Sequence, residues 1–141
     1  MTEQQSLLKS QFAYQITVVS RSDRLLGQFI DSIIGAVPFF AAAAIMWLSN
    51  TLGTVALVVG IVWNLAYFLF ADGVRDGQSL AKRYLGIRVI DAETGAPCTF
   101  GQSFVRNLLL AFLGPLDWIF IFGERHQRLG DKAAGTVVVY D

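Results

Sequence analysis

The stretch LLGQFIDSIIGAVPFFAAAAIMWL, from Leu25 to Leu48, decides the fold class of this chain. As a helix it is long enough to cross the roughly 30 Å of hydrocarbon in a bilayer. A second stretch, LGTVALVVGIVWNLAYFLFA from Leu52 to Ala71, has the same property. We therefore predict an integral membrane protein, surrounded by lipid, whose first two spans are residues 25–48 and 52–71.

The composition of the whole chain agrees with a membrane environment. Of its 141 residues, 54% are hydrophobic and 16% are charged, which leaves too few polar groups to cover a soluble protein of this size. The formal net charge is zero, and we expect no nucleic-acid partner. Cys98 is the only cysteine, which excludes an internal disulfide and a multi-cysteine metal site. The length fits one domain, 1–141.

Basic residues indicate which side of the membrane each segment occupies. The turn at 49–51 contains no Lys or Arg, whereas basic residues precede the first span and follow the second. Because cytoplasmic loops carry the excess of Lys and Arg, we expect residues 1–23 and 72–103 in the cytoplasm. These basic residues are Lys9, Arg21, Arg24, Arg75, Lys82, Arg83 and Arg88.

The cytoplasmic segment 72–103 has signals for structure of its own. Ser79 can cap a short helix at Leu80–Leu85. On that helix, Lys82 and Arg83 would be available to anionic lipid headgroups.

Two short runs have the pattern of strands. IRVID at Ile87–Asp91 alternates, and TVVVY at Thr136–Tyr140 is β-branched. A lone strand leaves its edge unpaired, so we expect the two runs to form a small hairpin-like sheet on the cytoplasmic side. The second run would lie in a cytoplasmic tail, residues 123–141.

The third apolar segment, FVRNLLLAFLGPLDWIFIF at Phe104–Phe122, leaves two alternatives open. It is nearly long enough to span, but it contains Arg106, Asn107 and Asp117. Gly114-Pro115 interrupts it, and a proline there removes a backbone donor and bends a helix. A simple crossing would also separate the two strands. We favour a bent or re-entrant helical segment, which makes the expected fold an all-α membrane protein with two transmembrane helices.

One acidic residue lies inside the first span. Asp31 follows Arg24 by nearly two helical turns, so both lie on one face about 10 Å apart, with Gln28 between them. A carboxylate in hydrocarbon costs roughly 3 kcal/mol or more unless it has a partner or a wet cavity. Asp31 is therefore a candidate functional residue.

Small residues surround this position. Gly27 and Gly35 lie about one turn on either side of Asp31 and allow another backbone, a water or a ligand to approach the carboxylate. On the second span, Gly60 and Asn64 share one face, and Asn64 is expected at the depth of Asp31. We expect a polar site between the two helices.

Two interpretations of Asp31 stay open. In the first, Asn64 and a hydroxyl such as Ser32 satisfy the carboxylate, which only orients the helices. In the second, which we favour, Asp31 binds a cation or proton or lines a substrate cavity. Asp117 either adds a second carboxylate to this site or caps the helix after Pro115. We expect no enzyme, cofactor or metal, because no nucleophile–base pair, phosphate loop or metal-ligand cluster is present.

Three blocks of sequence resemble the RDD family of bacterial membrane proteins, named for one Arg and two Asp. The Arg that opens the first membrane helix and the Asp in its middle correspond to Arg24 and Asp31. GQSLAKR at 77–83 and GDKAAGT at 130–136 resemble the two later blocks. Asp131 would then be the second Asp, and we expect it to form an ion pair with Arg24.

Two positions depart from the family pattern. Ala81 stands where glycine is usual, and Gly130 stands where members carry a His, which argues against a proton relay through that His. The resemblance covers about residues 12–140. It implies a multi-pass protein of the bacterial cytoplasmic (inner) membrane, from a family suspected of transport, including cation/proton exchange.

We therefore expect transport of a cation or small solute, with proton coupling as one form of it. Two or three helices cannot enclose a path, so this function requires a homo-oligomer or a larger membrane partner. The alternative is a non-transporting accessory or scaffold subunit. The candidate binding residues are Arg24, Gln28, Asp31, Asn64, Asp117 and Asp131, with Gly27, Gly35 and Gly60 as positions of close approach.

Overall fold

The computed structural model describes residues 2–8 and 17–141. Residues 3–8 are helical. Lys9, one of the basic residues used to orient the chain, lies outside the described residues, as does part of the predicted segment 1–23.

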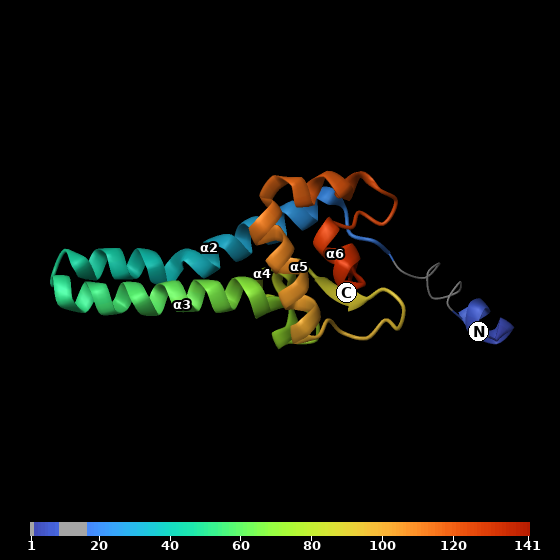
Figure 1. Ribbon diagram of the computed structural model, residues 1–141, viewed down its shortest axis with the longest axis horizontal. Helices are drawn as coiled ribbons and strands as arrows, with labels where there is room; N and C mark the ends of the chain where they lie inside the picture. Colours follow the sequence, from blue (N-terminus) through green and yellow to red (C-terminus); the bar gives the residue numbers. More distant parts are fainter. Residues whose placement is uncertain (1, 9–16) are drawn as a thin grey trace.

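Two long helices, α2 (Arg21–Met46) and α3 (Asn50–Val74), form a hairpin that projects from the rest of the molecule (Figure 1). Both extend beyond the predicted spans at the end where the other elements gather. The turn lies at Trp47 and Leu48, slightly earlier than predicted, because the Ser49 side chain already caps α3 by accepting from the Leu52 N–H.

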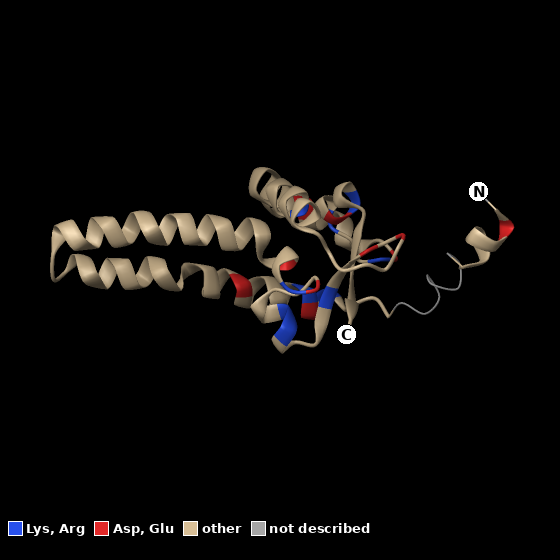
Figure 2. Ribbon diagram, turned by 90° about the horizontal axis from the view of Figure 1, so that it is seen from below, with Lys and Arg blue, Asp and Glu red and all other residues tan. Residues whose placement is uncertain are grey.

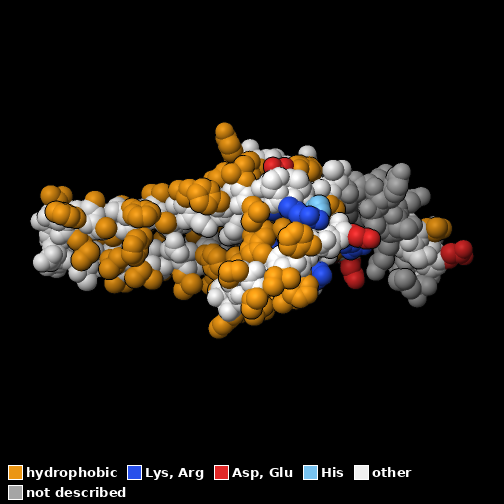
Figure 3. Space-filling model, turned by 90° about the horizontal axis from the view of Figure 1, so that it is seen from above, with side chains coloured by type: hydrophobic (Ala, Val, Ile, Leu, Met, Phe, Trp, Pro, Cys, Tyr) orange, Lys and Arg blue, Asp and Glu red, His pale blue; other side chains and the backbone are white. Residues whose placement is uncertain are grey.

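Glycines allow the two helices to touch. A Cβ placed on Gly60 would lie 3.2 Å from the Pro38 carbonyl, and one on Gly53 would lie 2.5 Å from the Met46 Cα. The close approach predicted for Gly60 is therefore present. Exposed apolar side chains are distributed along the hairpin, as the face in Figure 3 shows, and this is expected for helices that face lipid.

A small sheet lies at the base of the hairpin. Strand β1 (Ile87–Asp91) pairs antiparallel with β2 (Thr136–Tyr140), which confirms the predicted pairing. The pair is no hairpin in the sequence, because α5, η1 and α6 lie between the strands. Ile87, Val89 and Val138 on its buried face pack with Val19 and Cys98 into a core.

Two short helices flank the sheet. Helix α4 (Leu80–Tyr84) begins at Ser79, whose hydroxyl accepts from the Lys82 N–H as predicted. Helix α6 (Leu129–Ala134) ends at Gly135, which has a positive φ of 66° and leads directly into β2.

The third apolar segment is bent as predicted. Helix α5 (Phe100–Leu113) ends at Gly114, and the 3-10 helix η1 (Gly114–Phe122) continues from there. In Figure 1, α5 crosses the base of the hairpin and η1 turns off in a new direction. Among the described residues, three helical segments are thus long and apolar enough to cross a membrane, namely α2, α3 and Phe100–Phe122.

Charged residues gather at the base of the hairpin, whereas its outer part has none (Figure 2). No Lys, Arg, Asp or Glu occurs in the sequence between Asp31 and Asp72. The polar chemistry of the molecule is therefore concentrated where the helices, α5 and the sheet meet.

We expect Gly77→Ala to destabilise the protein. Gly77 has a φ of +79°, and a Cβ there would lie 1.9 Å from the Val89 carbonyl oxygen in β1. The strained backbone alone costs about 1–3 kcal/mol, and the clash adds to it. Thermal unfolding in mild detergent measures the loss.

Gly101→Ala is the matched control for this change. Its Cβ would meet nothing closer than 4.0 Å, in the first turn of α5. Alanine should be neutral there, or stabilising by up to about 1 kcal/mol. Equal loss of stability in the two variants would contradict the tight packing of Gly77 against β1.

Candidate functional site

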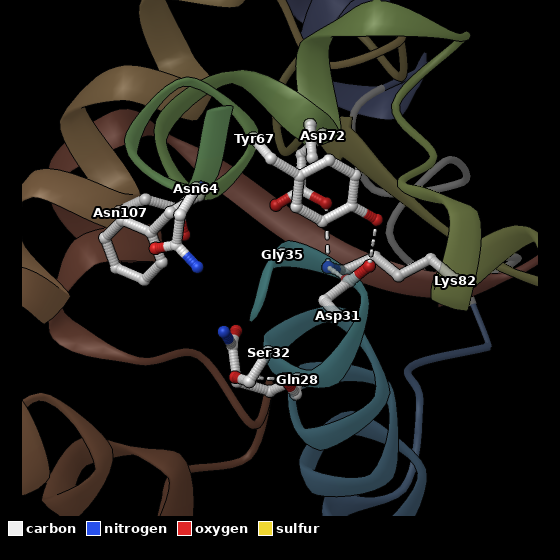
Figure 4. Close-up of a pocket in the computed structure, with 11 residues that line it drawn as sticks. Gln28, Asp31, Ser32, Gly35, Asn64, Tyr67, Asp72, Lys82 and Asn107 are labelled. Atoms are coloured by element: carbon white, nitrogen blue, oxygen red, sulfur yellow. Dashed lines mark hydrogen bonds and ion pairs between the residues drawn. The ribbon is translucent and has the colours of Figure 1, made fainter. Parts of the chain in front are cut away.

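Asp31 is buried and fully partnered, with 8% of its surface exposed. Its carboxylate accepts hydrogen bonds from the Tyr67 hydroxyl at 2.7 Å, the Ala81 N–H at 3.3 Å and the Ser79 hydroxyl. The Lys82 ammonium lies 3.2 Å from Asp31 Oδ2 (Figure 4). The acid inside the first span is thus held by groups from α3 and from the start of α4.

The hydrogen-bond partner of Asp31 on α3 differs from the one predicted. Asn64 lines the same pocket as Asp31, but the hydrogen bond comes from Tyr67, about one turn further along α3. The predicted hydroxyl, Ser32, donates instead to the Gln28 carbonyl of its own helix. A phenol reaches further than an amide, so the donor comes from one turn nearer the base.

Lys82 also departs from its predicted role. It is 7% exposed, and its ammonium lies 2.7 Å from Asp72 Oδ1 as well as near Asp31. The Ser79 cap sets the first turn of α4 against α2, so the Lys82 ammonium points into the hairpin base. Arg83 remains exposed.

Asp72 and Arg106 continue the ion pairs toward the sheet. The second oxygen of Asp72 lies 3.1 Å from Arg106 Nη1, and Arg106 Nη2 lies 2.8 Å from Asp131 Oδ1. Arg106 is the positive charge within the third apolar segment. It joins the end of α3 to α6 through α5.

Several ion pairs meet at Asp131, which lies in α6. It pairs with Arg24, which confirms the predicted ion pair, and it accepts from the Arg128 N–H at 3.0 Å. Arg24 also donates to the His126 carbonyl. Within the described residues the Arg24 side chain pairs with Asp131 and His126 and not with Asp31, so Arg24 and Asp31 are connected only through the intervening ion pairs of Asp131, Arg106, Asp72 and Lys82.

Asp117 belongs to the Asp131 end and not to the Asp31 pocket. It accepts from the Gly130 N–H at 2.7 Å and lies 3.6 Å from Arg128 Nε. It makes no side-chain cap of η1. Both predicted roles of Asp117 are therefore wrong, because burial against α6 turns its carboxylate toward Gly130 and Arg128.

These side chains form one connected set, which we call the charge network. All of its members are buried, and they are the only buried charged side chains in the described part of the chain. Four carboxylates balance four cationic groups, so the network is neutral. Its members are Arg24, Asp31, Asp72, Lys82, Arg106, Asp117, Arg128 and Asp131.

The network sets the charge states at its α6 end. Burial alone would raise the pKa of Asp131, but the positive charges of Arg106, Arg24 and Arg128 outweigh it and hold the pKa well below the usual range for a carboxyl. Burial lowers the pKa of Arg128 to about 10. Both groups are charged at neutral pH.

A polar cavity of about 120 Å³ lies beside Asp31 (Figure 4). It has room for several waters or a small hydrated cation. Of the predicted site residues, Gln28, Asp31 and Asn64 line it, whereas Arg24, Asp117 and Asp131 lie at the other end of the network. Its other polar lining groups are Ser32, Tyr67, Asp72, Lys82 and Asn107.

The glycines beside Asp31 let neighbouring segments approach. A Cβ on Gly35 would lie 3.3 Å from the Asn64 amide nitrogen, and one on Gly27 would lie 3.4 Å from Leu85. Gly130 permits an even closer contact, because a Cβ there would lie 2.2 Å from the Arg106 carbonyl oxygen. In this chain, α6 therefore packs on α5 in a way that leaves no room for a side chain at position 130.

Comparisons with known proteins agree with this picture. The model of the RDD family matches residues 18–135. An uncharacterized protein of Haemophilus influenzae is 28% identical over 138 residues, which cover 90% of this chain and 81% of that protein. A proline-rich antigen homolog of Mycobacterium tuberculosis is 31% identical over 140 residues, 94% of this chain. The chain spans about half (51%) of that mycobacterial relative. No solved structure matches.

We expect Asp131→Asn to destabilise the protein strongly. The change leaves the buried cations Arg24, Arg106 and Arg128 without their shared carboxylate. Breaking a buried pair from one side costs about 3–5 kcal/mol. Asp76→Asn, which changes an exposed carboxylate, is the control and should melt like the wild type.

The comparison of wild type with Asp131→Asn also gives a pH test. Because the folded-state pKa of Asp131 is depressed, its contribution is fully present above the unfolded pKa of about 4 and is lost as pH falls further. The difference in melting temperature between wild type and Asp131→Asn should stay constant from neutral pH to about pH 5 and shrink below it. A difference that grows on acidification would contradict this assignment.

Proposed function

The chain belongs to the RDD family, and on that premise we propose that it is a multi-pass membrane protein that binds and transports a small cation. One observation carries the proposal. The carboxylates of Asp31 and Asp72 converge on a single ammonium, at 3.2 and 2.7 Å, beside a polar cavity in an apolar hairpin. Such oxygens suit a small hard cation, and intramembrane acids typically mark ion pathways.

Neutrality of the charge network determines how a cation could enter. An added cation would leave an uncompensated positive charge in a buried site, which is costly. We propose that the Lys82 ammonium must leave Asp31 and Asp72 before a cation takes its place. Lys82 and the cation would then occupy the same oxygens in alternation.

The location of the elements supports one topology. The sheet, α4 and α6 lie at the same end of the hairpin (Figure 1), and Arg24 and Asp131 are joined there. If α2 and α3 cross the membrane, the segment 100–122 between β1 and β2 must return to the side it left. Together with the basic residues at this end, this favours two crossings and a re-entrant α5–η1 with both ends in the cytoplasm, at the bacterial inner membrane.

A homo-oligomer or a larger partner completes the proposal, since one hairpin and one bent segment cannot enclose a path. A second function, that of a non-transporting scaffold subunit, is favoured by the closed set of ion pairs. In that case the charge network only fastens the hairpin to α5, α6 and the sheet.

Asp31→Asn distinguishes the two functions. In the transporter, the change removes one of two anionic ligands, so cation flux into liposomes should be lost while the protein still folds and inserts. In the scaffold, the wild type itself gives no flux with Na⁺, K⁺ or a proton gradient. Asp76→Asn controls for loss of a carboxylate.

Lys82→Met tests whether Lys82 and a cation compete for the oxygens of Asp31 and Asp72. Without the ammonium, Asp31 and Asp72 should attract a free cation, so Na⁺ or K⁺ should raise the melting temperature relative to choline. Ligand at about 100 times its Kd contributes roughly 2.7 kcal/mol. Arg83→Met, which removes an exposed cation one residue further, should show no such effect. An equal response in both variants would remove the basis for the competition.

Cysteine labelling tests the topology. In a Cys98→Ala background, a probe on Asn50→Cys at the tip of the hairpin should react from outside intact cells. A probe on Arg125→Cys, in the exposed loop after η1, should stay protected until the membrane is permeabilised. External labelling of Arg125→Cys would establish a third crossing by residues 100–122 instead.

A further inference from the structure

A groove of about 670 Å³ runs along α3 between α4 and the start of α5. Its size lies within the range of small-molecule sites. Its walls are apolar: Trp63, Ala66, Phe70, Val74, Leu80 and Phe100 line it, and the rings of Trp63 and Tyr67 stack at 6.2 Å. Trp63 and Leu80 are each 49% exposed, so residues 2–8 and 17–141 leave this surface uncovered.

The groove has one polar end. Arg75 and Gln78 line it together with Ser79, at the point where α3 ends. Arg75, Gln78 and Val74 also line an adjoining polar hollow of about 610 Å³. The apolar groove and the polar hollow are therefore two parts of one continuous surface.

Two arginines in the polar hollow are available to a ligand. Arg75 and Arg83 are exposed, and neither has an ion pair within residues 2–8 and 17–141. The hollow also contains the carboxylates of Asp76 and Asp141. Asp141 is already engaged by Arg88 and by Gln78.

We propose that this surface binds a membrane phospholipid, with one acyl chain in the groove and the phosphate at Arg75 and Arg83. Arg75 is the first basic residue after the apolar stretch of α3, so it lies where the hydrocarbon ends and headgroup phosphates begin. A guanidinium group can donate two parallel hydrogen bonds to the oxygens of one phosphate, and the aromatic walls of the groove can pack on the methylene groups of an acyl chain. The surface thus matches both the apolar tail and the charged headgroup of one phospholipid.

The assignment relocates the lipid contact expected from the sequence. Lys82 is withdrawn into the charge network, whereas Arg83 stays exposed and acts with Arg75, on the other side of Gln78 and Ser79. The site lies next to Asp31, because Tyr67 lines both the groove and the polar cavity. It does not depend on whether that cavity carries a cation.

Native mass spectrometry of the full chain, titrated with phosphatidylglycerol in mild detergent, tests the proposal. The wild type should retain one lipid, and Arg75→Gln and Arg83→Gln should each weaken its binding roughly tenfold. Arg125→Gln, an exposed arginine away from the groove, should bind like the wild type. Ala66→Trp, which fills the groove without changing charge, should also weaken binding.

Three results would overturn the site. The first is that diacylglycerol, which has the tails without the phosphate, is retained as well as phosphatidylglycerol. The second is that inorganic phosphate alone binds at Arg75 and Arg83, which would indicate a site for a soluble anion. The third is that the lipid is lost as the mass spectrum shifts to a dimer, which would indicate that a second copy of the chain occupies the groove. If an arginine variant fails to fold, Ala66→Trp and the two probes still decide the outcome.

Discussion

The structure depends on the rule that a charge removed from water must meet an opposite charge. In the part of the chain that the structure describes, eight charged side chains are buried at the base of the hairpin, and each has at least one oppositely charged neighbour. These pairs join α2 to α6, α3 to α4 and α5, and α5 to α6. Because none of them can be broken without leaving a buried charge, the hairpin and the small sheet are held as one unit.

The sequence was sufficient for features that depend on local patterns. Length and apolarity predicted the hairpin, β-branching predicted the pairing of β1 with β2, and Gly114-Pro115 predicted the bend. The charge network was mostly missed, because its partners are far apart in the chain, as Lys82 and Asp31 are at 51 residues. Lys82 looked like a surface lysine, and only Arg106 inside an apolar run signalled a buried cation.

A cation transporter and a scaffold would have the same resting geometry at Asp31, Asp72 and Lys82. In both, Lys82 bridges Asp31 and Asp72 with the polar cavity beside them. They differ only in whether Lys82 can release the carboxylates. Membership of the RDD family supports the membrane domain, and under our proposal the mobility of the Lys82 side chain distinguishes a transporter from a scaffold.

The arrangement of charges along the chain has a consequence for biosynthesis. The first half of the network, Arg24, Asp31, Asp72 and Lys82, is neutral by itself, and so is the second half, Arg106, Asp117, Arg128 and Asp131. A chain is made from its N-terminus, so the hairpin leaves the ribosome before α5 and α6 exist. Lys82 can already pair with both acids of the hairpin at that stage. The nascent protein can therefore enter the bilayer with its acids matched, and the later segment docks as a second electroneutral piece.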